Sequence, residues 1–391
     1  MIAVRYPERR PVMPLPTGRK LVDALDFRRL PKVLLHEHLD GSLRPGTVAE
    51  LAVECGYTGL PTFDPVELAG WFHRGAQRGS LPEYLEGFAH TIAVMQTRDA
   101  LERTAWEFIE DMARDGVVYV EVRFAPVFHT SRGLSQDEVV AAVLAGLERG
   151  GRQFGVKWGL ILCAMRDRSD SLQAAELALR WRDQGVVGFD LAGGEAGHPP
   201  KRHLEAFHAI QRANFSITIH AGEAYGLESI WQALQWCGAH RLGHGTRLVD
   251  DMKQVDGEWQ LGRLARYVLD QRVPIEMCLL SNVHTGACRS VEEHPFGLFH
   301  RLGFRVFLNT DDRLMSDTEM SRELALAAEV FDLSLDDLEQ MTLSAMKSAF
   351  ACHETRVEMI HRRLLPTFGL LSAELTARAF SGEFDPASNT P

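Results

Sequence analysis

Two histidines separated by one residue, His36 and His38, end a short apolar run in the segment PKVLLHEHLDGS. Alternate side chains of an extended strand share a face, so both imidazoles are expected to project to the same side. Neutral imidazole is a common metal ligand. Polar strand ends and hydrogen-bonded core histidines are also common, so a metal site here requires further ligands from elsewhere in the chain.

Two other segments offer such ligands. His220 ends the apolar run of FSITIHAGE, and Asp311 ends that of FRVFLNTDD. Three imidazoles and one carboxylate form a donor set that suits Zn²⁺ and leaves room for a water ligand. Bound zinc lowers the pKa of such a water to about 7, which makes hydroxide available near neutral pH.

Three polar residues close to these ligands are candidates for proton transfer. Glu223 lies three residues beyond His220 and is a candidate proton shuttle, with an acid in the first turn of a helix as the alternative. His244 stands between two glycines in LGHGT, where it would orient or deprotonate the attacking water; a buried structural histidine is the alternative. Asp312 directly follows Asp311 and must point elsewhere, toward the water or the substrate.

Eight apolar runs, most of them separated by segments of helical periodicity, must position these side chains. They cover residues 32–40, 116–126, 156–165, 185–193, 215–223, 240–248, 273–282 and 304–312. Nearly continuous apolar runs are typical of parallel strands covered on both faces, and their alternation with helices predicts an α/β fold. Eight such units favour a closed (β/α)8 TIM barrel over an open doubly wound sheet, and no GxGxxG turn follows the first run.

Polar residues and glycines concentrate at the carboxyl ends of these runs, in HEHLD, RFAP, DLAGGE, HAGE, LGHG, LLSN and NTDD. Active sites of such barrels lie at this end of the strands. Strand eight neighbours strand one in a closed barrel, so Asp311 is expected to approach His36 and His38, with His220 reaching inward. Packing alone would not gather these residue types there, and we predict one active site at this end.

A long helical insertion, about residues 45 to 98, follows the first run. Within it, SLPEYLEGFAHTIAVM carries Leu81, Tyr84, Leu85 and Phe88 at helical spacing. The pattern predicts an amphipathic helix packed on the barrel. Insertions after a barrel strand project at the active-site mouth, so the same helix is also a candidate lid.

Length and composition set the remaining expectations. The chain has 391 residues, 45% of them hydrophobic, and a formal net charge of −11. The acidic balance argues against a nucleic-acid-binding surface and favours neutral or cationic ligands. Length allows one large barrel with additions. We expect a flexible arm over residues 1–20, a single barrel domain over 21–383 and a flexible tail over 384–391.

The six cysteines show no CxxC spacing, which predicts free thiols and a reducing compartment. No segment looks like a signal peptide or reaches the roughly 20 apolar residues of a membrane span. We therefore expect a cytoplasmic protein that binds neither membrane nor nucleic acid. Its oligomeric state does not follow from the sequence.

The motifs HEHLDGS, DLAGGE, HAGE, RLGHGT, CLLSN and NTDD, in this order and spacing, resemble the zinc-dependent adenosine deaminases of the amidohydrolase barrels. The resemblance runs from about residue 31 to about residue 350. It implies that one Zn²⁺ is bound by His36, His38, His220 and Asp311. It also implies that Glu223 protonates purine N1 while hydroxide attacks C6, so that ammonia leaves and inosine forms.

The resemblance further implies that His38, Asp40, Gly194 and Asp312 contact a purine nucleoside. Asp40 would hold the ribose 5′-hydroxyl, the backbone at Gly194 would contact purine N3, and Asp312 would contact N7 or the attacking water. His244 would assist the hydroxide.

Two features depart from the common pattern of that family. Arg313-Leu-Met-Ser follows NTDD, where many relatives have proline and a more apolar run, and Gly194-Glu195 stands where an acid often follows the first glycine. Both features lie near the predicted pocket rim and bear on substrate preference.

Three hypotheses of function follow. The leading one is zinc-dependent hydrolytic deamination of adenosine and 2′-deoxyadenosine in purine salvage. An alternative is a related deaminase of adenine or of a modified adenosine such as aminodeoxyfutalosine, although relatives of that kind often carry Glu in place of Asp40. A third is a barrel that binds nucleosides without turnover, which would be expected to lack a metal ligand or the acid; all are present here.

Overall fold

Eight parallel strands form the central sheet of the computed structural model, which describes residues 15–381 and 383. Their order is β1-β2-β3-β4-β5-β6-β9-β10, and each strand pairs in parallel with the next. The strands are β1 (Lys32–His38), β2 (Val117–Phe124), β3 (Lys157–Met165), β4 (Val186–Ala192), β5 (Ser216–Ala221), β6 (Arg241–His244), β9 (Ile275–Met277) and β10 (Val306–Leu308).

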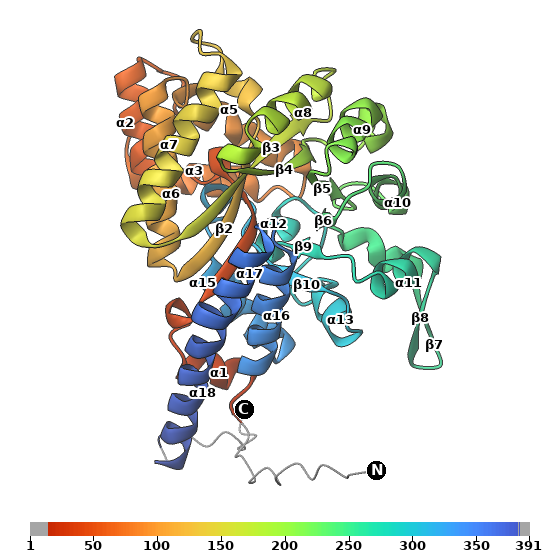
Figure 1. Cartoon of the computed structure of the whole chain (residues 1–391). Coiled ribbons are helices and arrows are strands. Elements are labelled where there is room, and N and C mark those ends of the chain that lie inside the picture. The colour runs from red at the N-terminus through yellow and green to blue at the C-terminus, as the bar shows by residue number, and fades with distance from the viewer. Residues whose placement is uncertain (1–14, 382, 384–391) are drawn as a thin grey trace.

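The first and last strands meet and close the sheet into a barrel. Glu37 and Asp311 form a parallel bridge between the end of β1 and the residues that follow β10. The His38 N–H donates to the Asp311 carbonyl at 2.7 Å, and the Asp311 N–H donates to the His36 carbonyl at 3.0 Å. The predicted (β/α)8 architecture is confirmed (Figure 1).

Helices surround the barrel because the strands are buried on both faces, as their nearly continuous apolar sequences predict. The helices that follow the successive strands are α7 (Gln136–Phe154), α8 (Ser171–Arg180), α9 (Leu204–Arg212), α10 (Leu227–Gln235), α11 (Arg263–Asp270), α12 (Leu279–His284), α13 (Phe296–Arg301), α14 (Arg313–Ser316), α15 (Met320–Phe331) and α16 (Leu335–Ser348). Local sequence sets their ends: α7 begins at a Ser135–Glu138 capping box and ends at Gly155, whose φ is 73°.

The insertion after β1 is helical, as predicted. It contains α2 (Pro45–Cys55), α3 (Pro65–Ala76), α4 (Leu81–Tyr84) and α5 (Phe88–Val94), and α6 (Arg98–Arg114) leads into β2. The expected single helix is divided by a 3₁₀ turn over Leu85–Gly87. Gly87 has low helix propensity, and a Cβ there would lie only 2.9 Å from the Met315 sulfur, so close packing favours glycine at this break.

The later strands are shorter than the apolar runs predicted. The segment LLSN lies in α12 and not in a strand, because the chain leaves the sheet after Met277 and the Leu279 N–H is bound by the Glu323 carboxylate. A hairpin of β7 (Met252–Val255) and β8 (Glu258–Leu261) was not predicted. Its Asp256-Gly257 turn has positive φ at both residues, and that dipeptide is the signal that was overlooked.

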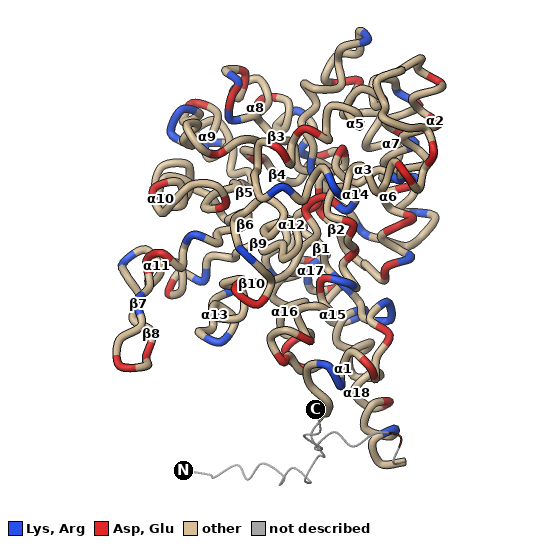
Figure 2. Tube along the Cα trace, turned by 180° about the vertical axis from the view of Figure 1, so that it is seen from behind, with Lys and Arg blue, Asp and Glu red and all other residues tan. Residues whose placement is uncertain are grey.

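The ends of the described chain lie together below the barrel, where α1 (Gly18–Ala24) contacts α15 and the chain continues through α17 (His353–Met359) into α18 (Leu365–Phe380). Helix α1 starts within the predicted arm, while residues 1–14 and 384–391 lie outside the described residues. Basic and acidic residues are interspersed along the outer helices (Figure 2). Within the described part, no helix combines the length and apolar character that crossing a membrane requires.

Candidate active site

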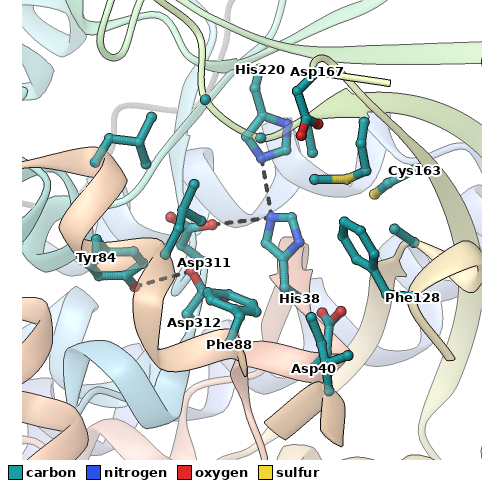
Figure 3. A pocket seen from close by; sticks show the side chains of 18 of the residues that line it. His38, Asp40, Tyr84, Phe88, Phe128, Cys163, Asp167, His220, Asp311 and Asp312 are labelled. Carbon is teal, nitrogen blue, oxygen red and sulfur yellow. Dashed lines mark hydrogen bonds and ion pairs between the residues drawn. The ribbon is translucent and has the colours of Figure 1, made fainter. Parts of the chain in front are cut away.

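The four predicted metal ligands meet at the carboxyl end of the barrel strands. His38 Nε2 lies 3.1 Å from His220 Nε2 and 3.4 Å from Asp311 Oδ1, and His36 Nε2 lies 3.1 Å from the same oxygen. One donor atom from each residue lies within 4.8 Å of all the others. Figure 3 shows His38, His220 and Asp311 converging from three different segments.

The protonation of these groups suits a divalent metal ion. Burial lowers the pKa of His38 to about 3, and burial also lowers the pKa of His220, so both rings are neutral and keep a lone pair. His36 Nε2 is buried and has no hydrogen-bond partner, which leaves it available as a ligand. Asp311 and Glu276 raise the pKa of His36 against the effect of burial, so this ring would release a proton on binding the ion. The three imidazoles and the carboxylate then fit zinc or a similar borderline ion.

A second group of possible ligands shares Asp311 and adds His244 and Cys278. Burial raises the pKa of the Cys278 thiol well above its ordinary value. Only the thiolate is a good metal ligand, so this set is less suited than the first.

Buried carboxylates contact the Nδ1 atoms of two of the candidate ligand rings. These carboxylates were not predicted from the sequence. Glu276 lies 2.9 Å from His36 Nδ1, and Asp190 lies 3.0 Å from His220 Nδ1. Arg123 joins the two carboxylates through contacts of 3.0 and 2.9 Å. A carboxylate at Nδ1 directs the Nε2 lone pair to the metal side of each ring.

A signal for these residues was present in the sequence. Asp190 and Glu276 are each the one charged residue of an apolar strand, in GFDLA and IEM, and Arg123 alternates with apolar residues and Glu121 in VEVRF. Such residues are rarely buried without partners. All three are fully buried here.

The predicted proton donor lies beside the predicted metal ligands. Burial, together with the negative charge of Asp311, raises the pKa of Glu223 to about 8. Its carboxyl lies 3.6 Å from His244 Nε2, and burial lowers the pKa of His244 well below its ordinary value. At neutral pH the site thus pairs a protonated acid with a neutral imidazole.

A hydrogen-bonded chain of side chains fixes the His244 ring. The Asn282 side-chain amide lies 2.9 Å from His244 Nδ1, and Asn282 in turn contacts His294. The preceding residue, Gly243, packs closely on His36 and His220, since a Cβ there would lie 3.1 Å from both the His220 Cα and a carbon of the His36 ring.

The loop that carries Glu223 is tied down by Glu195, the acid at which DLAGGE departs from the common pattern. The Glu195 carboxylate accepts hydrogen bonds of 2.7 to 3.0 Å from four consecutive backbone N–H groups, those of residues 222–225. Glu195 itself is buried. This role was not predicted, because contacts to backbone amides leave no pattern in the sequence.

Asp312 points away from Asp311, as expected, and toward the predicted lid. Its Oδ2 accepts a hydrogen bond of 3.1 Å from the Tyr84 hydroxyl, while its Oδ1 is buried without a partner (Figure 3). Burial and the charge of Asp311 raise the pKa of Asp312 well above its ordinary value. A protonated carboxyl can donate a hydrogen bond as well as accept one.

A cavity of about 400 Å³ opens onto these groups, a size suited to a small molecule. Gly194, Glu223, His244 and Asp312 line it, as do the lid residues. Asp40 stands at the side away from His220 and lies 3.5 Å from His129 Nε2. The predicted site residues in its lining are His38, Asp40, Leu81, Tyr84, Leu85, Phe88, Gly194, His220, Glu223, His244, Asp311 and Asp312. His36 lies against Asp311 and His220, outside this lining.

Comparison with known proteins decides the family. Residues 31–363 match the family model described as adenosine deaminase. The chain belongs to the adenosine deaminase family. Among curated relatives of this enzyme family, adenosine deaminase 1 of Streptomyces coelicolor is 55% identical and covers 89% of each chain, and adenosine deaminase of Mycobacterium ulcerans is 52% identical, covering 91% of this chain and 99% of its own.

A solved structure adds a likeness in three dimensions. Arabidopsis ADAL in complex with GMP superimposes with a TM-score of 0.75 at 29% identity and covers 89% of this chain and 99% of its own. The family and fold of this deaminase therefore agree with the resemblance of its motifs.

Proposed function

We propose that this member of the adenosine deaminase family hydrolyses adenosine and 2′-deoxyadenosine to inosine and 2′-deoxyinosine, with release of ammonia and with one zinc ion per chain. The observation that carries the proposal is the placement of Glu223, an acid held protonated at neutral pH, beside a three-histidine, one-aspartate cluster in a single nucleoside-sized cavity.

His36, His38, His220 and Asp311 are the residues that would hold the zinc ion. Zinc bound there lowers the pKa of a water molecule and so supplies the nucleophile near neutral pH. The orphaned His36 Nε2 and the carboxylates behind His36 and His220 support this assignment, because they leave the Nε2 atoms available to the ion.

Glu223 and His244 carry out the proton transfers. Attack at C6 of the purine pushes electrons onto N1, and Glu223 donates its proton there, which avoids a negative charge on the ring. Neutral His244 accepts a proton from the attacking water. Ammonia then departs from C6 with that proton. The C6 hydroxyl gives its remaining proton back to Glu223 as the carbon–oxygen double bond of inosine forms, so both groups return to their starting states.

Asp312 and Gly194 would orient the purine. Purine N7 is an acceptor, so it requires a donor, and the protonated carboxyl of Asp312 supplies one. The backbone at Gly194 is the expected partner of N3. Neighbouring Gly193 also lines the cavity and has a φ of 92°, so the strand end there consists of two residues without side chains.

Asp40 would select the sugar end of the substrate. Its carboxylate is suited to a ribose 5′-hydroxyl, which donates a hydrogen bond, and is unsuited to a 5′-phosphate. Within the described lining of the cavity there is no Lys or Arg, while Asp40 and Asp167 both contribute to it. Nucleosides are therefore favoured over nucleoside monophosphates.

Parallel turnover assays test this function. Purified protein with measured zinc content would be assayed on adenosine, 2′-deoxyadenosine, adenine, AMP and aminodeoxyfutalosine, following the absorbance change on deamination. We expect the two nucleosides to give the highest kcat/KM. A preference for free adenine or for the modified nucleoside would overturn the proposal, and binding of adenosine without turnover would support a non-catalytic barrel.

We also propose that the protein resides in the cytoplasm. All six cysteines are free thiols, and three of them, Cys163, Cys237 and Cys278, are buried in the core. This usage is in keeping with a reducing compartment. Fractionation of cells followed by an activity assay tests it.

A further inference from the structure

The metal-binding Asp311 has a strained backbone that its surroundings must stabilise. Its φ is 65°, in the left-handed region that residues with a Cβ rarely adopt. Such conformations are unfavourable and persist only where the neighbouring structure determines them. The strand that leads to this residue, β10, is only three residues long, so the strand itself offers little support.

Glu37 provides that support from an unexpected place. It lies between the ligands His36 and His38 on β1, and its fully buried carboxylate contacts both flanks of the Asp311–Asp312 pair. On one flank it accepts a hydrogen bond from the Thr310 hydroxyl. On the other it accepts hydrogen bonds from the Arg313 backbone N–H at 3.4 Å and from Arg313 Nε at 2.9 Å.

Arg313 is itself held in place by three further contacts. Its Nη2 donates to the Ser42 carbonyl at 3.2 Å, its Nη1 lies 3.5 Å from Asp111 Oδ2, and its guanidinium lies over the Phe108 ring at 5.5 Å. Asp111 belongs to α6, so these contacts anchor the clamp to a long helix outside the barrel. The guanidinium is therefore preorganised toward Glu37.

We propose that the Glu37–Arg313 ion pair is a positioning clamp for the metal site. It fixes Thr310 and Arg313, and thereby holds Asp311 and Asp312 between them in the geometry that the ligand and the purine-binding carboxyl require. This inference rests on the proposed zinc-dependent function, and it assigns a role to the arginine that departs from the family pattern. Glu37 and Arg313 belong neither to the lining of the cavity nor to the candidate ligand groups, and they act through Asp311 and Asp312.

Four variants test the clamp. Thr310→Val removes the hydrogen bond from the Thr310 hydroxyl to Glu37 without changing the charge or size of the side chain. Arg313→Gln removes the guanidinium, and Glu37→Gln removes the charge of the shared acceptor. Arg313→Lys keeps the positive charge. The matched control is Arg149→Gln. It breaks a surface ion pair between Arg149 on α7 and Glu102 on α6, and both residues are distant in sequence from β1 and β10.

Zinc release into a chelator, steady-state kinetics and thermal unfolding would be measured for each variant. We expect Thr310→Val, Arg313→Gln and Glu37→Gln to weaken zinc retention and to lower kcat/KM by about 10- to 100-fold, as removal of outer partners of a metal ligand does. Arg313→Lys should recover part of the loss, and the control should match the parent. Lower melting temperatures with unchanged zinc release and kinetics would overturn the clamp and leave only a structural ion pair.

Backbone hydrogen exchange provides a readout that does not depend on the metal. The His38 and Asp311 amides form the hydrogen bonds that close the barrel at this point. In metal-free protein we expect both amides to exchange at least tenfold faster in Thr310→Val and Arg313→Gln than in the control; equal rates would contradict the clamp. Failure of the proposed function would look different, since the parent protein would then hold no stoichiometric zinc or would not deaminate adenosine.

Discussion

Two neighbouring carboxyl groups in this site carry opposite protonation states, and the proposed reaction depends on that difference. Interactions with His36 outweigh burial and hold the pKa of Asp311 well below its ordinary value, so this proposed metal ligand is an anion. For Glu223 the balance is reversed: burial and the charge of Asp311 outweigh the interactions with Thr285 and His36 and raise its pKa to about 8. A ligand and a proton donor thus arise from the same kind of side chain in two environments.

Replacing Glu223 by Gln separates these roles. The amide keeps the size of the side chain but has no proton of suitable acidity, so we expect kcat to fall by about 10²- to 10⁴-fold. Zinc content should stay stoichiometric, because Glu223 is not one of the proposed ligands. Elemental analysis together with single-substrate kinetics measures both effects, and near-parental activity would exclude Glu223 as the donor.

The pH dependence follows from the same group. Glu223 donates a proton only when it is protonated, and its raised pKa of about 8 keeps it protonated throughout the neutral range. As pH rises through 8 the acid ionises, so kcat/KM should decline above that pH, approaching a tenfold loss per unit. A pH–rate profile of the free enzyme checks this, and a profile that keeps rising above pH 9 would contradict it.

At the scale of elements, short loops beyond the strands determine where the reactive groups stand. Residues 222–225 form the turn between β5 and α10, and Glu195 from the loop after β4 binds all four of their backbone N–H groups. The helical segment 81–94, which belongs to the insertion after β1, lines the same cavity. Two connections and one insertion therefore enclose the cavity.

Glu195→Ala should release the turn that carries Glu223. The four N–H groups would lose their common acceptor, and Glu223 would sample positions away from N1. Because a misplacement of about 1 Å can cost 10²-fold in rate, we expect kcat to fall by one to two orders of magnitude, with a smaller change in KM. Steady-state kinetics on adenosine measure the split, and Glu195→Asp provides a conservative comparison. A change confined to KM would argue against this role of the turn.

At the scale of the whole molecule, the metal site joins strands that are far apart in the sequence. The four ligands come from β1, β5 and the segment after β10, so a bound ion would cross-link the beginning, middle and end of the barrel. A ligand that binds only the folded state stabilises it by mass action.

Metal removal should therefore lower the thermal stability. Free zinc at 100 times its Kd adds about 2.7 kcal/mol to the free energy of unfolding. We expect the melting temperature of the parent to rise when zinc is restored to chelator-treated protein. His220→Ala, which removes one ligand, should lose both the zinc and this rise. Stoichiometric zinc in His220→Ala would remove His220 from the ligand set.

The local pattern of the sequence was sufficient to predict the barrel and the residues that meet in its mouth. Burial on both faces leaves a nearly unbroken apolar strand, and a polar strand end such as HEHLD is conspicuous beside it. A strand was predicted over residues 273–282, but only its part Ile275–Met277 forms β9; the helix α12 that follows was not predicted, because an apolar run of this length suits either state.

The sequence by itself thus determined the fold, the family resemblance and the candidate residues that meet in the barrel mouth, since these depend on residue type and on order along the chain. Tertiary structure alone decided the hydrogen-bond and ion-pair partners of these residues and their protonation states. Glu276 behind His36, Glu195 beneath the Glu223 turn and Glu37 against Arg313 are all contacts between distant segments. Their pKa values and geometry arise from burial and from neighbouring charges, and neither exists until the barrel has closed.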